Sequence, residues 1–78
     1  MDDTQMTYGQ KAVGLNFNPS GDPLVTEAKE LSAKLIDLAN AIRETEGGRS
    51  ERARHASIAI TELESAQMRL VKAITFKN

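Results

Sequence analysis

The sequence predicts an all-α fold: an antiparallel two-helix hairpin with an N-terminal arm or short helix, assembled as a helical homo-oligomer. Apolar residues recur at steps of three and four along two long segments, 23–45 and 50–76, a period typical of amphipathic helices. Neither segment contains glycine, and the only proline in them is Pro23, at the first helical position. The pair Gly47-Gly48 separates the segments, and so short a connection favours antiparallel helices.

Length and composition narrow the class of protein. The chain of 78 residues predicts a single domain, 1–78, and its formal charge of −1 argues against a general DNA or RNA partner. It contains no cysteine, which excludes disulfides and cysteine-based zinc sites. With no membrane-length apolar run and no visible signal peptide, we expect a cytoplasmic protein without a cofactor or a bound metal.

The segment before the first long helix has a mixed character. We expect residues 1–8 to form a flexible tail and residues 9–21 an ordered arm with room for one short helical turn. Leu15 and Phe17 alternate with asparagines there, and turn-forming residues follow. The arm is predicted to lie across an apolar surface.

The first long helix, 23–45, begins with an Asp22 cap and Pro23. Its apolar stripe is expected to form the core and consists of Leu24, Ala28, Leu31, Leu35, Leu38 and Ile42, widened on one side by Val25, Ile36 and Ala39. Gly47-Gly48 should end this helix, because glycine adopts left-handed backbone at little cost.

The second long helix, 50–76, starts from Ser50 as a cap. Its core stripe is Ala56, Ile60, Leu63, Leu70 and Ile74, with Gln67 in the one gap, and Ala59, Ala66 and Ala73 recur every seven residues beside it. The alanines would let a partner helix approach closely.

Three further apolar residues of this helix face away from the core stripe. At about 100° per residue, Ile58, Met68 and Phe76 lie on the opposite side, and we call them the back-face ridge. A mixed apolar and hydroxyl surface of this kind predicts a subunit interface. The alternative is that the N-terminal arm folds over the ridge within one chain.

Several residues are candidates for a binding site. Arg49, Arg52 and Arg54 crowd the start of the second helix, where free N–H groups favour an anion. The alternative is a solvated charge run balanced by neighbouring glutamates. Phe17 could stack on a nucleobase or pin the arm to the hairpin, and Tyr8 has the same two interpretations.

Two more side chains complete the candidates. Lys29 is expected between the core stripe and solvent, as a ligand contact or an ordinary surface lysine. His55 has no second histidine or cysteine for a metal and no nucleophile for a relay. Nothing in the sequence indicates an enzyme.

The second helix also carries a motif. The run SIAITELESAQM and the following VKAI resemble the second helix of the phage anti-CBASS and anti-Thoeris cyclic-nucleotide sponges, whose pattern is close to R-x-x-S-[IL]-A-[IL]-T-x-L-E-x-A-x-M. The matching residues are Arg54, Ser57, Ile58, Ala59, Ile60, Thr61, Leu63, Glu64, Ala66 and Met68. The arm FNPSGD resembles the aromatic-containing segment before the family's first helix. The likeness covers about residues 9–76 and is most specific over 54–74.

The resemblance implies a function. Family members form hexamers that hold cyclic di- and trinucleotides of bacterial immunity without cutting them, so this chain would act in the cytoplasm of the infected bacterial host. It implies that Phe17 and Lys29 serve a dinucleotide site, with Tyr8 as the alternative aromatic, because relatives commonly place a tyrosine where this arm has Asn-Phe-Asn. It implies that Arg54 serves a trinucleotide site, and Ser57 and Thr61 of the same motif join the candidate ligand-binding residues. The competing readings are a protein-binding adaptor and an enzyme that degrades the same nucleotides.

Overall fold

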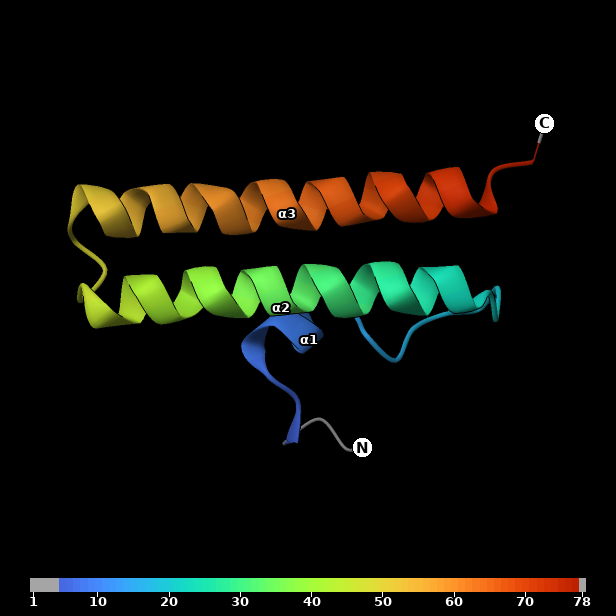
Figure 1. Ribbon diagram of the computed structural model, residues 1–78, viewed down its shortest axis with the longest axis horizontal. Helices are drawn as coiled ribbons and strands as arrows, with labels where there is room; N and C mark the ends of the chain where they lie inside the picture. The colour runs from blue at the N-terminus through green and yellow to red at the C-terminus, as the bar shows by residue number, and fades with distance from the viewer. Residues whose placement is uncertain (1–4, 78) are drawn as a thin grey trace.

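The structure is a computed structural model that describes residues 5–77. This part of the chain contains three helices. They are α1 (Tyr8–Val13), α2 (Pro23–Thr45) and α3 (Glu51–Thr75). The chain turns back after α2, so that α3 lies alongside it, and α1 packs against α2 and also contacts α3 (Figure 1). The all-helical prediction is confirmed, and both long helices fall where the apolar period places them.

The ends of the long helices have the expected caps. The Asp22 carboxylate accepts a hydrogen bond of 2.9 Å from the amide of Leu24, and the Ser50 hydroxyl accepts one of 3.1 Å from Ala53. Gly47 and Gly48 have φ values of 67° and 75°, so the turn needs the left-handed backbone that glycine provides.

Helix α1 is longer than the single turn expected in the arm. It begins at Tyr8, inside the segment expected as a tail; the rest of that prediction, for residues 1–4, lies outside the described residues. Thr7 and Gln10 form a reciprocal capping box, in which each side chain accepts a hydrogen bond from the other residue's amide. Gly14, with φ of 64°, ends the helix.

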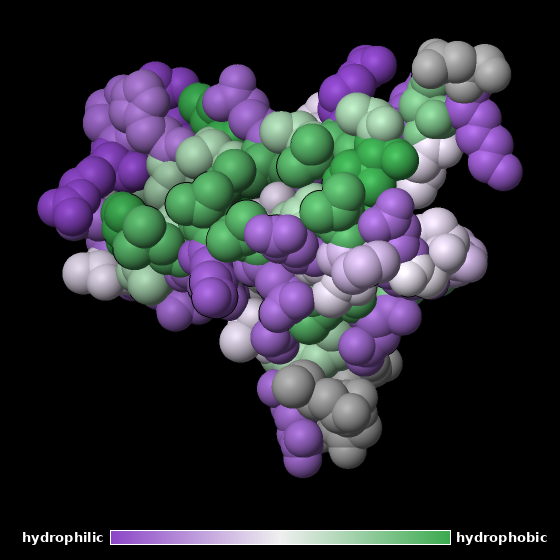
Figure 2. Space-filling model, turned by 45° about the vertical axis from the view of Figure 1, so that its right-hand side comes forward, coloured by the Kyte–Doolittle hydropathy of each residue, from purple (hydrophilic) through white to green (hydrophobic). Residues whose placement is uncertain are grey.

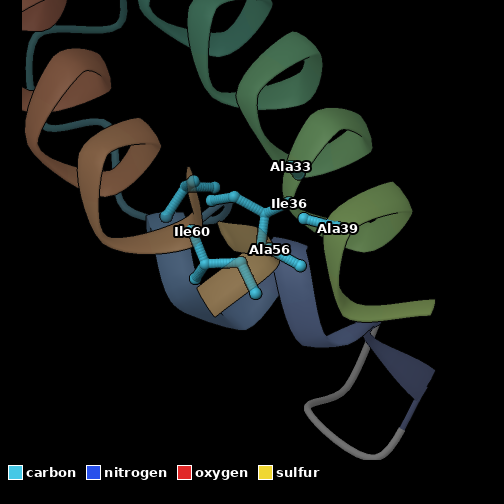
Figure 3. Packing of buried hydrophobic residues seen from close by; sticks show 6 residues of the cluster. Ala33, Ile36, Ala39, Ala56 and Ile60 are labelled. Atoms are coloured by element: carbon cyan, nitrogen blue, oxygen red, sulfur yellow. The ribbon is translucent and has the colours of Figure 1, made fainter. Parts of the chain in front are cut away.

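The core lies where the three helices meet. Figure 3 shows Ile36 of α2 and Ile60 of α3 pointing toward one another between the helices. The buried cluster is Val13, Ala33, Ile36, Ala39, Ala56 and Ile60. Gln67 is also buried, and its Oε1 has no hydrogen-bond partner among the described residues. Three of the six cluster residues are alanines, so the helix backbones can approach closely.

The leucines expected in the core are exposed. Leu24, Leu31, Leu35 and Leu38 keep 56%, 55%, 51% and 61% of their surface exposed, so the prediction of a leucine core stripe is wrong. Ala28 is the member of the predicted stripe that is buried, together with Val25, Ile36 and Ala39, which were expected only to widen it. The physical reason is that α1 and α3 both pack on the side of α2 that carries small residues.

We call this exposed surface the leucine face. It consists of Leu24, Leu31, Leu35 and Leu38 with Leu70 of α3, and shallow apolar grooves of roughly 400 and 240 Å³ run between the two helices along it. Figure 2 shows apolar residues gathered in a band over the long helices, edged by polar ones. By helical arithmetic, Leu31 and Leu38 lie on the side of α2 turned away from Lys29 and Ala33, against which α1 packs.

The back-face ridge is exposed as well. Ile58, Met68 and Phe76 keep 41%, 61% and 61% of their surface exposed. The alternative in which the N-terminal arm covers this ridge is wrong, because α1 packs against α2 instead. The hairpin thus presents two separate apolar surfaces.

Candidate ligand-binding sites

The arm after α1 is tied to α2 by one lysine. Lys29 Nζ donates a hydrogen bond of 3.0 Å to the carbonyl of Gly14 and a second, shorter one to the carbonyl of Phe17. Only 6% of the residue is exposed, so the expectation that Lys29 borders solvent is wrong. Burial lowers the pKa of its ammonium group, because the charged form loses hydration.

The ring of Phe17 lies above this lysine. Lys29 Nζ is 5.4 Å from the ring centroid, within the range of a cation–π contact. The residue is nevertheless 71% exposed, so it does not pin the arm by burying itself in the hairpin. Its ring is presented at the surface.

An open hollow of roughly 580 Å³ adjoins the ring. Its lining residues are Met6, Lys11, Gly14, Leu15, Asn16 and Phe17. Lys11 is exposed and stands in the last turn of α1, so it adds a solvent-accessible positive charge to the hollow. No sequence pattern connects Lys11 with Phe17, because only the turn at Gly14 brings both residues to the same hollow. An aromatic face beside a cation suits a ligand with a base and a phosphate.

A second group of candidates follows one side of α3. Arg54 donates to both carboxylate oxygens of Glu51, from Nε at 2.9 Å and from Nη2 at 3.1 Å. This pair raises the pKa of Arg54 and lowers the pKa of Glu51. Ser57 and Thr61 continue the same side, and the Thr61 hydroxyl donates to the Ser57 carbonyl at 3.3 Å.

The basic residues at the start of α3 also have acidic neighbours. Arg52 lies 3.9 Å from Glu46, and His55 lies 3.6 Å from Glu51. The pairs Arg52–Glu46 and Arg54–Glu51 therefore agree with the interpretation of this segment as a charge run balanced by glutamates. Glu51 binds the guanidinium group that a bound anion would otherwise use.

Arg43 of α2, which no sequence pattern points to, contacts residues of all three helices. Arg43 lies with its guanidinium 5.1 Å from the Tyr8 ring centroid, donates to Asn40 at 2.8 Å, and reaches the Ser57 hydroxyl at 3.4 Å. An open groove of roughly 490 Å³ adjoins it, lined in part by Gly47 and Gly48. Tyr8 and Arg43 are far apart in the sequence, so no local pattern connects them.

The candidate residues of the arm and those beside α3 lie in different places. Phe17 and Lys29 belong to the arm, whereas Tyr8 contacts Arg43 beside Ser57. Tyr8 is not among the residues that line the hollow at Phe17. Over residues 5–77, no cluster of three or more histidine or acidic side chains could hold a metal ion. No helix in this range is long and apolar enough to span a membrane.

Comparison with known proteins gives one match. A family model described as Acb2/Tad1, hairpin domain, matches residues 10–75, which include all of α2 and α3 and most of α1. No curated protein and no solved structure matches the chain significantly.

Proposed function

Because this chain belongs to the Acb2/Tad1 hairpin-domain family, we propose that it is a phage-encoded sponge that binds cyclic di- and trinucleotide signals of bacterial immunity and withholds them without degrading them. In this proposal it acts in the cytoplasm of the infected host and assembles as a homohexamer. The observation that carries the proposal is the exposed ring of Phe17 above the Lys29 ammonium, beside a hollow that contains Lys11.

The chemistry of the arm fits a cyclic dinucleotide. A nucleobase can stack on an aromatic ring that is exposed at the protein surface. Such stacking is worth about 1–3 kcal/mol per base. The phosphodiester groups need cations, which the lysines of this region supply. We assign the dinucleotide site to the arm, with Phe17 as its aromatic residue.

The candidate residues along α3 suit a cyclic trinucleotide. Arg54 projects from the first turn of α3, and its planar guanidinium can bond two phosphate oxygens at once. In this proposal a trinucleotide phosphate replaces Glu51 as the partner of Arg54, and the hydroxyls of Ser57 and Thr61 accompany it. Tyr8 and Arg43 border this site through Ser57.

The apolar surfaces support assembly. The structure measures 44 × 30 × 12 Å between its outermost Cα positions, about one helix thick along its shortest axis, so each long helix leaves much of its surface uncovered. The leucine face and the back-face ridge lie on different sides of the hairpin. A hexamer with dihedral symmetry needs two different interfaces between its chains. In this proposal the leucine face forms one of them and the back-face ridge forms the other.

A second candidate function draws on the same surfaces. A protein-binding adaptor would use the leucine face or the ridge to bind a different protein, because exposed patches of this kind mark interaction sites. The adaptor predicts no affinity for cyclic nucleotides, whereas the sponge predicts retention of them.

The test is a retention experiment. Pure protein is incubated with a panel of cyclic di- and trinucleotides, separated from free ligand by gel filtration, and denatured. Chromatography of the released material should show intact cyclic ligand in the protein fraction. Recovery of linear product would indicate an enzyme, and no retention of any ligand would favour the adaptor.

A further inference from the structure

The two helices contribute side chains of different size to the leucine face. On α2, exposed leucines recur every seven residues, so at about 100° per residue they form a nearly straight ridge. They are Leu24, Leu31 and Leu38, and we call them the leucine ridge. On α3, small residues recur at the same interval on the side that carries Leu70. They are Ala59, Ala66 and Ala73, and we call them the alanine strip.

The leucine ridge and the alanine strip lie at matching levels along the hairpin. Leu38 and Ala59 line the same groove. Because α3 runs back along α2 (Figure 1), a step of seven residues in opposite directions from this pair leads to Leu31 and Ala66. We call Leu31 and Ala66 the central pair. A further step leads to the last leucine and the last alanine, so each leucine of the ridge has an alanine at its own level on the neighbouring helix.

This arrangement suits a second copy of the same chain. A two-fold axis that runs along the groove, parallel to both helices, exchanges α2 with α3 and leaves the level of every residue unchanged. The leucine ridge of each copy then lies on the alanine strip of the other. Ridges of large side chains fit into such strips because alanine leaves room for them. The face is therefore complementary to itself in shape.

Charged side chains border the leucine face on both edges of the hairpin. At about 100° per residue, Glu27 and Lys34 lie on the side of the leucine ridge away from α3. Glu62 and Arg69 lie on the side of the alanine strip away from α2. All four are exposed, and within the described part of the chain none of them takes part in an ion pair. Both helices separate the two edges, so these charges do not meet within one chain.

The same two-fold axis brings opposite charges together. Lys34 and Glu62 each lie about one turn from the central pair toward the loop between α2 and α3. Glu27 and Arg69 lie about one turn from it in the other direction. Lys34 of one copy therefore meets Glu62 of the second copy. Glu27 likewise meets Arg69 of the second copy, and the symmetry makes each pair occur twice.

We propose that the leucine face binds a second copy of this chain about a two-fold axis parallel to α2 and α3, with the leucine ridge of each copy on the alanine strip of the other and the charges of the two edges paired. This inference rests on the assembly in the proposed function and gives one of its interfaces a geometry. It uses no property of the nucleotide sites. The back-face ridge is then left for the other interface of the hexamer.

A charge-swap experiment tests the pairing without any ligand. Glu27→Arg places like charges together twice between identical chains, and so does Arg69→Glu. Each variant alone should need at least about tenfold more protein to assemble, because like charges that face one another across an interface repel. An equimolar mixture should assemble within about threefold of the concentration that the unmodified chain needs, since both contacts between unlike chains then join opposite charges. Sedimentation velocity over a concentration series measures the assembly.

A mixture of Glu27→Arg with Lys34→Glu is the matched control. Its chains carry the same changes in net charge as the first mixture, but two like-charge contacts remain between unlike chains, so assembly should stay weak. A mixture of Lys34→Glu with Glu62→Lys tests the second pair independently and should restore assembly. The four positions are exposed, so the helix content measured by circular dichroism should be unchanged in every variant.

Two results would overturn the proposal. One is a pair of single variants, Glu27→Arg and Arg69→Glu, that assemble as tightly as the unmodified chain. The other is a mixture of the two that assembles no better than either variant alone. These results leave the hexamer and its ligands untouched, whereas an unmodified chain that stays single at micromolar concentration would refute the assembly together with this inference. Retention of cyclic nucleotides decides the binding function separately.

Discussion

The backbone amide of Gly9 donates a 2.7 Å hydrogen bond to Oδ1 of Asp37, and this bond joins α1 to the middle of α2. The approach is close enough that a Cβ atom at Gly9 would lie 2.1 Å from the carbonyl oxygen of Ala33. Docking of α1 therefore depends on glycine at this position.

Gly9→Ala should destabilise the protein, although alanine favours a helix by about 1 kcal/mol over glycine. Overpacking of this kind costs about 1–3 kcal/mol, and the backbone of α2 cannot yield as a side chain could. Denaturant unfolding measures the change. Asp37→Asn, which keeps the Oδ1 acceptor, is the control and should cost less. A Gly9→Ala variant that is more stable than the unmodified chain would contradict the docking of α1.

The period of apolar residues predicts the long helices but not which of their apolar residues are buried. The N-caps Asp22 and Ser50 act through neighbouring residues, so the first residues of α2 and α3 could be predicted from the sequence. The period of α2 identifies an apolar side but not which part of it faces α3. Leu35 and Ile36 are adjacent, yet Leu35 is half exposed and Ile36 is fully buried.

The candidate sites depend still more on tertiary contacts. Phe17 could be recognised as an aromatic residue in a turn-rich arm, but its pairing with Lys29 needs the fold-back at Gly14. The burial of Lys29 follows from the same fold-back. Arg43 joins Tyr8 and Ser57 only because three helices meet there.

Assembly through two interfaces gives a graded prediction. Leu38→Glu on the leucine face and Met68→Glu on the ridge should each break one interface, since an unpaired charge in an interface costs several kcal/mol. Each single variant should leave assemblies of two or three copies, and the double variant should leave single chains. Light scattering after gel filtration measures the mass. If either single variant releases single chains directly, then one interface holds the assembly. A folded monomer of the unmodified chain at micromolar concentration would contradict assembly altogether.

The Glu51–Arg54 pair predicts a pH dependence of stability. The hydrogen bonds from Arg54 lower the pKa of Glu51 from its ordinary value of 4.5. The folded chain therefore binds this proton less readily than the unfolded chain, so the pair's stabilisation is present above pH 4.5 and is lost as the pH falls through the lowered pKa. The difference in Tm between the unmodified chain and Arg54→Ala should be small and positive at neutral pH, because the pair is exposed. The difference in Tm should shrink as the pH falls below 4.5, where Glu51 becomes protonated. A difference that grows on acidification would contradict this role of the pair.

The same pair makes a prediction for ligand binding. Glu51 and a trinucleotide phosphate would compete for one guanidinium, so Glu51→Gln should tighten the binding of a cyclic triadenylate. Arg54→Ala should weaken it sharply, and Arg54→Lys should recover only part, since lysine cannot form the paired bonds. Calorimetric titration measures all three variants, with a cyclic dinucleotide as the control ligand that none of them should affect strongly. Full trinucleotide affinity in Arg54→Ala would remove Arg54 from the site.

Sequestration without turnover is the central claim, and native mass spectrometry of the pure protein with a cyclic dinucleotide tests it most directly. We expect an assembly of six chains that carries a whole number of intact ligands, with a mass that stays constant during long incubation. A bound or released species heavier than the cyclic ligand by one water would show that the protein hydrolyses it. An assembly that binds no ligand at any concentration tested would contradict the sponge itself.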